Sequence, residues 1–422
     1  MKQHNKIPKG YKQTELGIIP EDWEFSPSQK YLKEISMGPF GSDIKVENFV
    51  RFGVPVLNGA NLQSYRLIDK FENYVTSQKA AALKKAVANK EDIIITHRGT
   101  LGQVAYIPKS AKFDKYVISQ SQFRVRFNEC IDPEFIVRYL LSPIGQDGLL
   151  EFKGHTGVPA LAQPTTNFRN LHLLIPPIAE QRAIAEALSD VDGLITALDK
   201  KIAKKRLLKQ GTMQQLLTGK TRLPGFTNEW VEVQVKKLGK WSKGQPFSKD
   251  KISVDGKNLC IHYGELFSYG EVIENIKSHT DVKPYVKSSG KDVLFPASDV
   301  TPSGLGRCSA LNVKNILLGG DIIILNVAKD CPAYISYVIN LNKQQIIDRV
   351  TGTTVKHINS TLLGEINIRI STNINEQQAI ATILGTLDKE IVALEAQRDK
   401  YRLLKSGMMQ KLLTGQIRLK TE

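Results

Sequence analysis

The sequence predicts an α+β protein in which two globular domains alternate with two long helices, and the helices pair as an antiparallel coiled coil. Three observations predict this class. A segment of 48 residues occurs twice at an offset of 196 residues, with 25 identical positions. Apolar residues in both copies follow the 3–4 spacing of a coiled-coil seam. Short β-like runs and turns fill the two stretches of comparable length outside the copies.

The repeat is clearest at its end, where residues 207–223 read LLKQGTMQQLLTGKTRL and residues 403–419 read LLKSGMMQKLLTGQIRL. The same offset, 403 − 207 = 196, aligns the Glu-Gln pairs at 180–181 and 376–377. Identity of this extent indicates a duplication. We therefore expect two halves of the chain to be related by a pseudo-two-fold axis.

Each copy is predicted to form one long helix. Pro176 and Pro177 prevent the first helix from extending backwards, and Gly219 and Gly415 are suitable C-terminal stops. About 40 residues at roughly 1.5 Å each would give a rod on the order of 60 Å long. One apolar stripe alone would indicate ordinary core packing, but two stripes of matching phase favour pairing with each other. The predicted seam consists of Ile184, Leu188, Val191, Ile195, Leu198, Ile380, Leu384, Leu387, Ile391 and Leu394.

These features divide the chain into four parts. A first globular domain is expected at 1–177, opening with a distinct segment at 1–24. A helix at 178–222, a second globular domain at 223–372 and a helix at 373–422 follow.

The composition indicates a polyanionic partner. The chain has 422 residues, 58 Lys+Arg against 42 Asp+Glu, and a net charge of +16. Such a basic surface favours nucleic acid. No run approaches the roughly 18 apolar residues of a membrane span, and the polar N-terminal stretch lacks the apolar region of a secretory signal. Four widely spaced cysteines fit free thiols in a reducing compartment. We expect a cytoplasmic protein with no membrane partner.

The sequence contains no complete catalytic motif. Gly219-Lys220-Thr221 mimics the end of a phosphate-binding loop, but Gln214 stands where that motif needs glycine. Glu151-Phe152-Lys153, with Asp132 upstream, could be the acidic cluster of a metal-dependent nuclease. However, Asp132 precedes Pro133 and is expected to cap a helix. We expect no catalytic residue and no metal site. The alternative is a self-contained DNA-acting enzyme, a nuclease, with an unrecognised active site.

Several motifs resemble a known family. The EQxAIA starts at 180–185 and 376–381 and the LLKxGxMQxLLTG endings resemble conserved regions of type I restriction-modification specificity subunits. The opening GYKQTELGIIPEDWE at 10–24 and the GPFGS motif at 38–42 also resemble that family. The resemblance covers essentially the whole chain. The second domain departs from the pattern, because GQPFS at 244–248 lacks the second glycine.

The resemblance implies a function. It implies a non-catalytic subunit of a multisubunit DNA adenine methyltransferase and ATP-dependent restriction endonuclease. Two target-recognition domains would each read one half of a bipartite target in double-stranded DNA, and the paired helices would set the spacer. Two modification subunits would dock on the helices, and two restriction subunits with translocase and nuclease activity could join. S-adenosylmethionine, ATP and Mg²⁺ are expected on these partners, and no cofactor on this chain. A scaffold of another defence complex is a third hypothesis.

Polar residues in predicted turns are the candidates for DNA contacts, because base reading in the major groove requires donors and acceptors on loops that can enter it. The alternative for each is turn chemistry. In the first domain the candidates are Ser42, Lys45, Asn58, Asn61, Arg98, Thr100, Gln103, Gln120 and Gln122. In the second domain they are Lys243, Gln245, Ser248, His262, Tyr263, Ser298 and Lys356.

Overall fold

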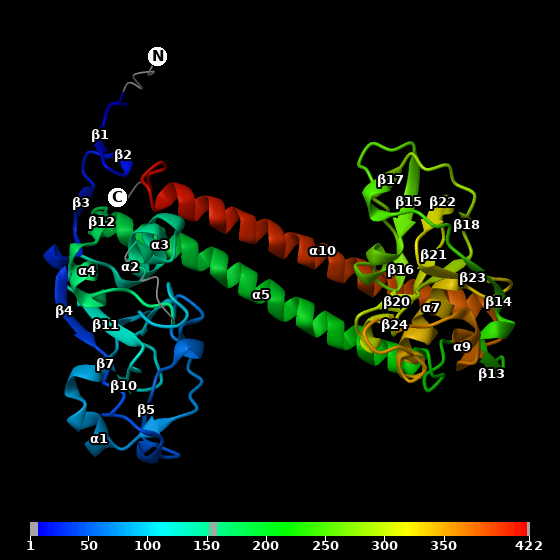
Figure 1. Ribbon diagram of the computed structural model, residues 1–422, viewed down its shortest axis with the longest axis horizontal. Helices are drawn as coiled ribbons and strands as arrows, with labels where there is room; N and C mark the ends of the chain where they lie inside the picture. The colour runs from blue at the N-terminus through cyan, green and yellow to red at the C-terminus, as the bar shows by residue number, and fades with distance from the viewer. Residues whose placement is uncertain (1–6, 152, 154–157, 420–422) are drawn as a thin grey trace. The chain divides into compact units, whose positions relative to one another are not determined.

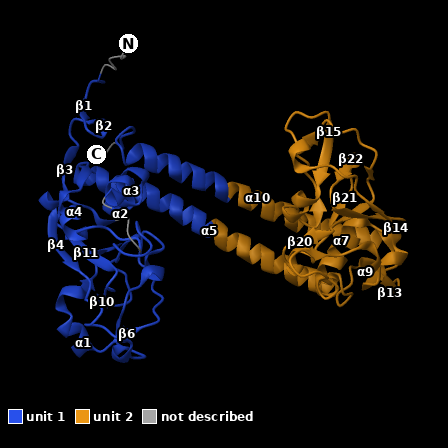
Figure 2. Ribbon diagram, viewed as in Figure 1, with its two compact units in different colours: residues 1–197, 398–422 blue, residues 198–397 orange. Residues whose placement is uncertain are grey.

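The computed structural model describes residues 7–151, 153 and 158–419 (Figure 1). It divides into two compact units (Figure 2). Unit 1 consists of residues 1–197 and 398–422, and unit 2 consists of residues 198–397. Each unit therefore contains one globular domain and a part of each long helix.

The domain of unit 1 is built on a four-stranded antiparallel sheet of order β4-β11-β8-β9. The strands are β4 (Leu32–Met37), β11 (Gln122–Phe127), β8 (Ile93–Thr96) and β9 (Val104–Tyr106). The central strand β8 reads IIIT and is buried at every position. It is buried because the sheet separates two cores: Ile93 and Ile95 pack on one side, and Ile94 packs on the other.

Helices and short strands complete unit 1. On the side of Ile93 and Ile95 lie α2 (Pro133–Leu140), α3 (Pro143–Leu150) and α4 (Pro164–Asn170), and each begins with proline in its first turn. The Asp132 carboxylate accepts the Phe135 N–H at 2.9 Å and so caps α2. The remaining elements are β1 (Tyr11–Thr14), β2 (Gly17–Pro20), β3 (Glu24–Pro27), β5 (Val54–Pro55), β6 (Tyr74–Val75), α1 (Ser77–Ala82), β7 (Val87–Asn89), β10 (Lys115–Val117) and β12 (His172–Ile175).

The domain of unit 2 repeats this frame. Its larger sheet has the order β14-β23-β19-β21-β16, and its first four strands are antiparallel neighbours like those of unit 1. These strands are β14 (Gly239–Lys243), β23 (Ile322–Val327), β19 (Asp292–Pro296), β21 (Ser309–Leu311) and β16 (Val272–Ile273). A second sheet, of order β17-β15-β22-β18, consists of β17 (His279–Thr280), β15 (Asn258–His262), β22 (Lys314–Gly319) and β18 (Lys287–Ser289).

The other elements of unit 2 flank these sheets. Helix α7 occupies the place that α2 has in unit 1, since both follow the sheet and pack against its core. The elements are β13 (Trp230–Gln234), β20 (Ser298–Asp299), α6 (Pro302–Leu305), α7 (Pro332–Leu341), α8 (Lys343–Ile347), β24 (Lys356–His357), α9 (Ser360–Gly364) and β25 (Asn367–Ser371).

The two long helices are α5 (Ile178–Leu216) and α10 (Ile374–Leu412), each of 39 residues and about 58 Å long at 1.5 Å per residue. In unit 1 the core joins Ile184, near the start of α5, to Leu412 at the end of α10. In unit 2 it joins Ile380, near the start of α10, to Leu216 at the end of α5. The helices are therefore antiparallel in both units, and the predicted α+β class with paired helices is confirmed.

The predicted seam residues differ in burial. The four that are nearest the starts of the two helices lie in the domain cores, whereas those farther along are either buried outside these cores or only half-buried. The buried residues are Ile184, Leu188, Val191, Ile380, Leu384 and Ile391. The half-buried residues are Ile195, Leu198, Leu387 and Leu394. Two helices without a domain beside them cover one stripe of each other and leave its flanks in water.

A buried glutamate in the first turn of α5 connects the distant parts of unit 1. Glu180 is 2% exposed and receives two hydrogen bonds from Arg418, from Nε and Nη2, each of 2.7 Å. The indole Nε1 of Trp23 donates to the same carboxylate at 3.0 Å. Arg418 also pairs with Asp22, and its hydrogen bonds lower the pKa of that carboxyl group. Residues near both chain ends thus meet at the start of α5.

Unit 2 has the same arrangement at the start of α10. Glu376 is fully buried and accepts hydrogen bonds from Nε and Nη2 of Arg222 at 2.7 and 3.0 Å. The Ser371 hydroxyl donates to the same carboxylate. The Arg222 guanidinium lies 5.8 Å from the ring centre of Trp230, as Arg418 lies 6.0 Å from Trp23.

A second polar contact holds each domain against both helices. In unit 1, Asp192 of α5 accepts from Arg138 of α2 and from Lys405 of α10, each at 2.7 Å. Asp388 of α10 is the equivalent residue under the 196-residue offset. It accepts a hydrogen bond from Tyr337 of α7 at 2.6 Å and pairs with Lys209 of α5 at 2.5 Å. The repeat therefore extends to the individual polar contacts.

The buried glutamate of unit 2 gives a stability prediction. Glu376→Ala leaves the Arg222 guanidinium beside an apolar site without its carboxylate partner. We expect the free energy of unfolding to fall by about 3 kcal/mol. In contrast, Lys389→Ala, which removes an exposed ion pair with Glu274, should cost less than about 1 kcal/mol. Thermal and urea unfolding measure both, and equal losses would show that Glu376 is not an anchor.

Candidate nucleic-acid interface

One edge of the unit 1 sheet gathers three loops that carry predicted DNA-contacting residues. In the antiparallel register Phe123 faces Met37 and Gln122 faces Thr96. The end of β4, the end of β8 and the start of β11 therefore lie at the same edge. Gly38 allows the close approach of two of these loops, because a Cβ there would lie 2.0 Å from the Ser119 carbonyl oxygen.

Five predicted residues at this edge expose their side chains. Gly99, between two of them, has a φ of 88°, so the loop after β8 turns through a conformation that favours glycine. His97 contacts the Gln120 carbonyl oxygen at 3.2 Å through Nε2, and burial lowers the pKa of its ring, which favours the neutral form. The exposed predicted residues are Ser42, Lys45, Arg98, Thr100 and Gln120.

The other four predicted residues of unit 1 form hydrogen bonds within the domain, and the two asparagines among them form one turn. Asn61 is 1% exposed, accepts the Asn58 N–H at 2.9 Å and donates to the Ile68 and Lys70 carbonyls. Asn58 caps the same turn by accepting the Ala60 N–H at 2.9 Å. For these two asparagines the structure therefore agrees with the alternative given in the sequence analysis, which is that they stabilise a turn.

The two glutamines are also engaged within the domain. Gln122 is 1% exposed and accepts the Ser119 N–H at 3.0 Å. Gln103 is half-buried and donates to the Gly59 carbonyl at 3.2 Å. Asn61 and Gln122 therefore present no side chain to a partner in this conformation.

Unit 2 presents a matching edge. Lys243 at the end of β14 faces Ile323, and Pro296 at the end of β19 faces Ile322 at the start of β23. His262, at the end of β15, faces Gly319. The loops that follow β14, β15 and β19 and precede β23 thus meet there, as the loops of β4, β8 and β11 meet in unit 1.

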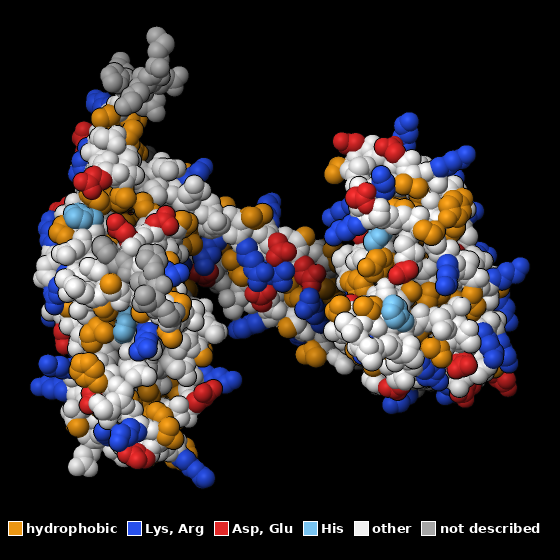
Figure 3. All heavy atoms as spheres, in the orientation of Figure 1, with side chains coloured by type: hydrophobic (Ala, Val, Ile, Leu, Met, Phe, Trp, Pro, Cys, Tyr) orange, Lys and Arg blue, Asp and Glu red, His pale blue; other side chains and the backbone are white. Residues whose placement is uncertain are grey.

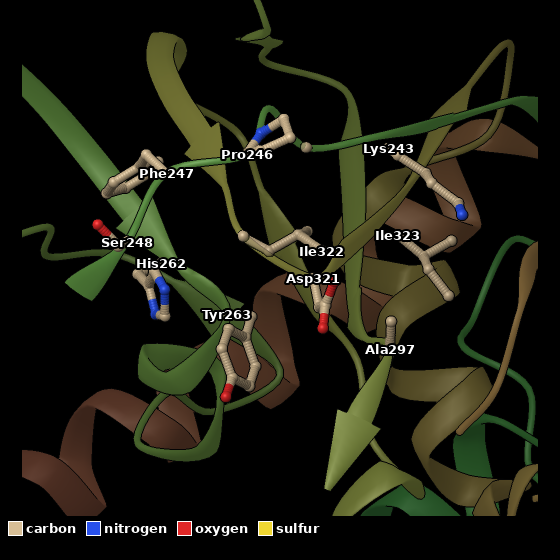
Figure 4. Close-up of a pocket in the computed structure, with 12 residues that line it drawn as sticks. Lys243, Pro246, Phe247, Ser248, His262, Tyr263, Ala297, Asp321, Ile322 and Ile323 are labelled. Atoms are coloured by element: carbon tan, nitrogen blue, oxygen red, sulfur yellow. The ribbon is translucent and has the colours of Figure 1, made fainter. Parts of the chain in front are cut away.

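A pocket of about 540 Å³ opens between these loops (Figure 4). It is lined by four predicted residues, together with Phe247, Asp321 and apolar residues of β23. Lys243 lies on one side of the view, and Phe247, Ser248 and His262 lie on the other (Figure 4). The four predicted residues are Lys243, Ser248, His262 and Tyr263.

The remaining predictions in unit 2 bond within the domain. Gln245 is 1% exposed, and its carbonyl oxygen accepts the N–H groups of Tyr285 and Val286 at 2.7 and 3.0 Å. Ser298 donates to an Asp321 carboxylate oxygen at 3.1 Å. Lys356 donates to the carbonyl oxygens of two residues of its own loop, at 2.7 and 2.9 Å. Gln245 is therefore a structural residue of the edge.

Three residues of these edges were not predicted from the sequence. Phe40 is 80% exposed beside Ser42. Phe247 stands at the matching place of the second domain and lines the pocket with Asp321. The Pro-Phe pair that GPFGS and GQPFS share is a sequence signal that could have identified both phenylalanines. Asp321 follows two glycines and has no such signal, because its neighbours in the pocket are distant in sequence.

Neither a single basic patch on the face shown in Figure 3 nor a metal-binding cluster stands out in the part of the chain that the structure describes. Lys and Arg side chains are scattered over the face of each unit that Figure 3 shows. Among the residues that the structure describes, no three His, Cys, Asp or Glu side chains gather as a metal site. Asp132 of the nuclease hypothesis caps α2, and Phe152 of that motif lies outside the described residues. Within the same part of the chain, no helix is both long and apolar enough to cross a membrane.

Two repeated α+β domains, each packed on the same helix pair and each with a loop-bearing sheet edge, define a class of two-domain proteins built by internal duplication. The profile of the family described as type I restriction modification DNA specificity domain matches residues 45–206 and 227–401. The chain belongs to this family. It is the specificity subunit of a type I restriction-modification system and is not by itself an enzyme, which decides against the self-contained nuclease.

Individual relatives agree with this family. The chain is 25% identical to the putative type I restriction enzyme MjaX specificity subunit of Methanocaldococcus jannaschii, over 98% of both chains. It is 22% identical to the MjaVIII specificity subunit of the same organism, over 95% of this chain and 94% of the relative. The fold is similar to that of the S subunit of a type I restriction-modification system from M. genitalium, with a TM-score of 0.62, 15% identity and 98% of both chains covered.

The exposed edge of unit 1 gives a prediction about binding. Arg98→Ala should weaken DNA binding by the assembled complex by about 1–3 kcal/mol if Arg98 reads a base, and should relax the preference at one position. A phosphate contact would instead weaken all sequences alike and reduce the salt dependence. The control is Lys109→Ala, which removes the same charge beyond the opposite end of β9. Unchanged affinity and sequence preference for Arg98→Ala would remove it from the interface.

Proposed function

We propose that each unit reads one half of a bipartite DNA target and that the paired helices set the spacer between the halves. The observation that carries this proposal is the duplicated sheet edge. Loops with exposed polar side chains follow β4 and β8 in unit 1, and comparable loops follow β14 and β19 in unit 2. Two equivalent edges on one repeated frame fit two half-sites.

Charge supports a DNA partner. The net charge of +16 favours attraction to the phosphate backbone, which supplies most of the sequence-independent affinity. The exposed polar groups at the two edges would then supply the sequence preference. Helices of equal length, 39 residues each, suit a fixed spacer because an α-helix has a constant rise per residue.

Exchange of one domain tests this proposal. Replacing residues 25–175 by the equivalent domain of another specificity subunit should change one half of the methylated sequence. The other half and the spacer length should persist, because the exchange leaves residues 224–371 and both helices intact. Genome-wide methylation mapping in cells that also contain the modification subunits gives the result. A change in both halves, or in the spacer, would contradict the assignment of one half-site to each unit.

We further propose that two modification subunits dock on the helices, one at each of two exposed leucine pairs. Leu207 and Leu208 are 70% and 51% exposed, and Leu403 and Leu404 are 76% and 51% exposed. The pairs are related by the 196-residue offset. Exposed bulky apolar side chains in two equal contexts favour two copies of one partner.

The leucine pairs can be tested separately. Leu207→Ser with Leu208→Ser should abolish one modification-subunit site, and the matching change at Leu403 and Leu404 should abolish the other. Each pair should contribute about 2–4 kcal/mol if the exposed part of both side chains becomes buried. Val392→Ser is the control, since Val392 is 62% exposed but has threonine at its equivalent position. Mass measurement of the assembled complex should give one bound subunit for either double variant, and two bound subunits would overturn the proposal.

The remaining partners follow from this assignment. We propose that the modification subunits bring S-adenosylmethionine and that two restriction subunits, with ATP and Mg²⁺, can join the complex. We also propose a cytoplasmic location, where such a complex meets its DNA.

A further inference from the structure

The pocket of unit 2 has features beyond those needed to contact a base edge. Its volume is about 540 Å³, and it opens at the edge where β14, β19 and β23 meet. Ile322 and Ile323, each 1% exposed, contribute apolar surface to it. Aromatic and charged side chains stand around this apolar surface (Figure 4).

Two glycines make room for the aromatic side of the pocket. A Cβ at Gly319 would lie 1.6 Å from the Phe247 ring, and a Cβ at Gly320 would lie 3.2 Å from Nε2 of His262. Gly320 also has a φ of 65°, which favours glycine. The Phe247 and His262 rings meet edge to face with their centres 5.6 Å apart. The backbone is therefore shaped to hold these two rings beside the pocket.

His262 supplies a hydrogen-bond donor. It is 8% exposed, and its Nδ1 accepts the Gly264 N–H at 3.3 Å. Nε2 consequently carries the proton of the neutral ring. Burial lowers the pKa of His262, which favours that neutral form at neutral pH.

Acceptors and a cation complete the set. Asp321 is exposed, and only its Oδ2 atom is engaged by Ser298, at 3.1 Å. Tyr263 adds a hydroxyl group, and Lys243 is exposed at the other side of the pocket. A ring face, a donor, an acceptor and a nearby cation together suit a planar heterocycle that is linked to a phosphate.

The location of the pocket indicates a source for that heterocycle. It lies among the loops assigned to DNA, so the proposed function supplies a polymer of bases and phosphates. A stacked base presents only its edge to a protein, whereas contact with the Phe247 ring requires a free base face. We propose that the pocket of unit 2 receives one base of its half-site after that base has left the stack. The inference rests on the proposed function of unit 2.

The base proposed to enter the pocket of unit 2 is not the adenine that the modification subunits methylate. Those subunits are expected to extract the adenine that they methylate. The base held by unit 2 would be a second one, at a position of the half-site that carries no methyl group. Phe247 would stack on it, Asp321 and Tyr263 would contact its polar edge, and Lys243 would lie near its phosphate.

A mismatch scan tests the proposal on the complex of the full chain with its modification subunits. The target is first mapped by methylation, and duplexes are then prepared with a mismatch opposite each base of the half-site read by unit 2. A mismatch removes the cost of unpairing, so the base that enters the pocket should show tighter binding, on the order of tenfold. A mismatch opposite a base that is read within the duplex should leave the affinity of the complex for the duplex unchanged or lower it.

Variants connect the effect to the pocket. Phe247→Ala should abolish the tighter binding at the unmethylated position, and Tyr263→Phe, which removes only a hydroxyl group, should reduce it. Phe40→Ala is the matched control, because it changes the same Pro-Phe pair in unit 1 and should leave the effect intact. If Phe247→Ala does not fold, Tyr263→Phe decides.

Two results would overturn the inference. One is a half-site in which no mismatch outside the methylated adenine tightens binding. The other is a tightening that persists unchanged in both pocket variants. Failure of the proposed function is a different result, because unit 2 would then have no half-site in the methylation map.

Discussion

The buried carboxylate in the first turn of each long helix is the constraint on which the remaining structure depends. Glu180 and Glu376 lie at equivalent positions, and each is bonded through both oxygens to an arginine that follows the opposite helix. A buried carboxylate requires such a partner, because an unpaired charge there would be strongly destabilising. The contact therefore fixes which helix end meets which helix start, and with it the antiparallel order.

The same contact is built from different pieces of chain in the two units. In unit 2, Arg222 and Trp230 belong to one short segment that links α5 to the second domain. In unit 1, Arg418 comes from the segment after α10, and Trp23 comes from the segment before β3. One continuous segment in unit 2 thus corresponds to two separate segments in unit 1. The two copies of the sequence repeat, 176–223 and 372–419, therefore each carry near their end the arginine that binds the glutamate near the start of the other copy.

The helices could be predicted from the sequence, because their periodicity and their identity under a single offset are local properties. Their surroundings could not be predicted in the same way. The spacing predicts that Leu188 and Leu384 belong to a seam between the helices, whereas they lie in the cores where the domains pack on those helices. A 3–4 spacing identifies the apolar face of a helix but does not say whether a helix or a domain covers it.

The candidate site was predictable to the level of loops. Arg98 and Thr100 follow a buried strand and are exposed, as expected for residues after β8. Gln245 is equally polar, yet its amide is engaged by backbone groups about 40 residues away, which no local pattern reveals. Asp321 was missed for the complementary reason, since its neighbours around the pocket are distant in sequence. The position of Arg418 has a consequence for how unit 1 tolerates proteolysis. A cut before Arg418 would remove the side chain that joins Glu180 to Asp22, and Trp23 would be left as a donor to the buried Glu180 carboxylate. The short segment after α10 therefore contributes a buried ion pair to unit 1, although such segments at the surface of a domain are often removed without effect.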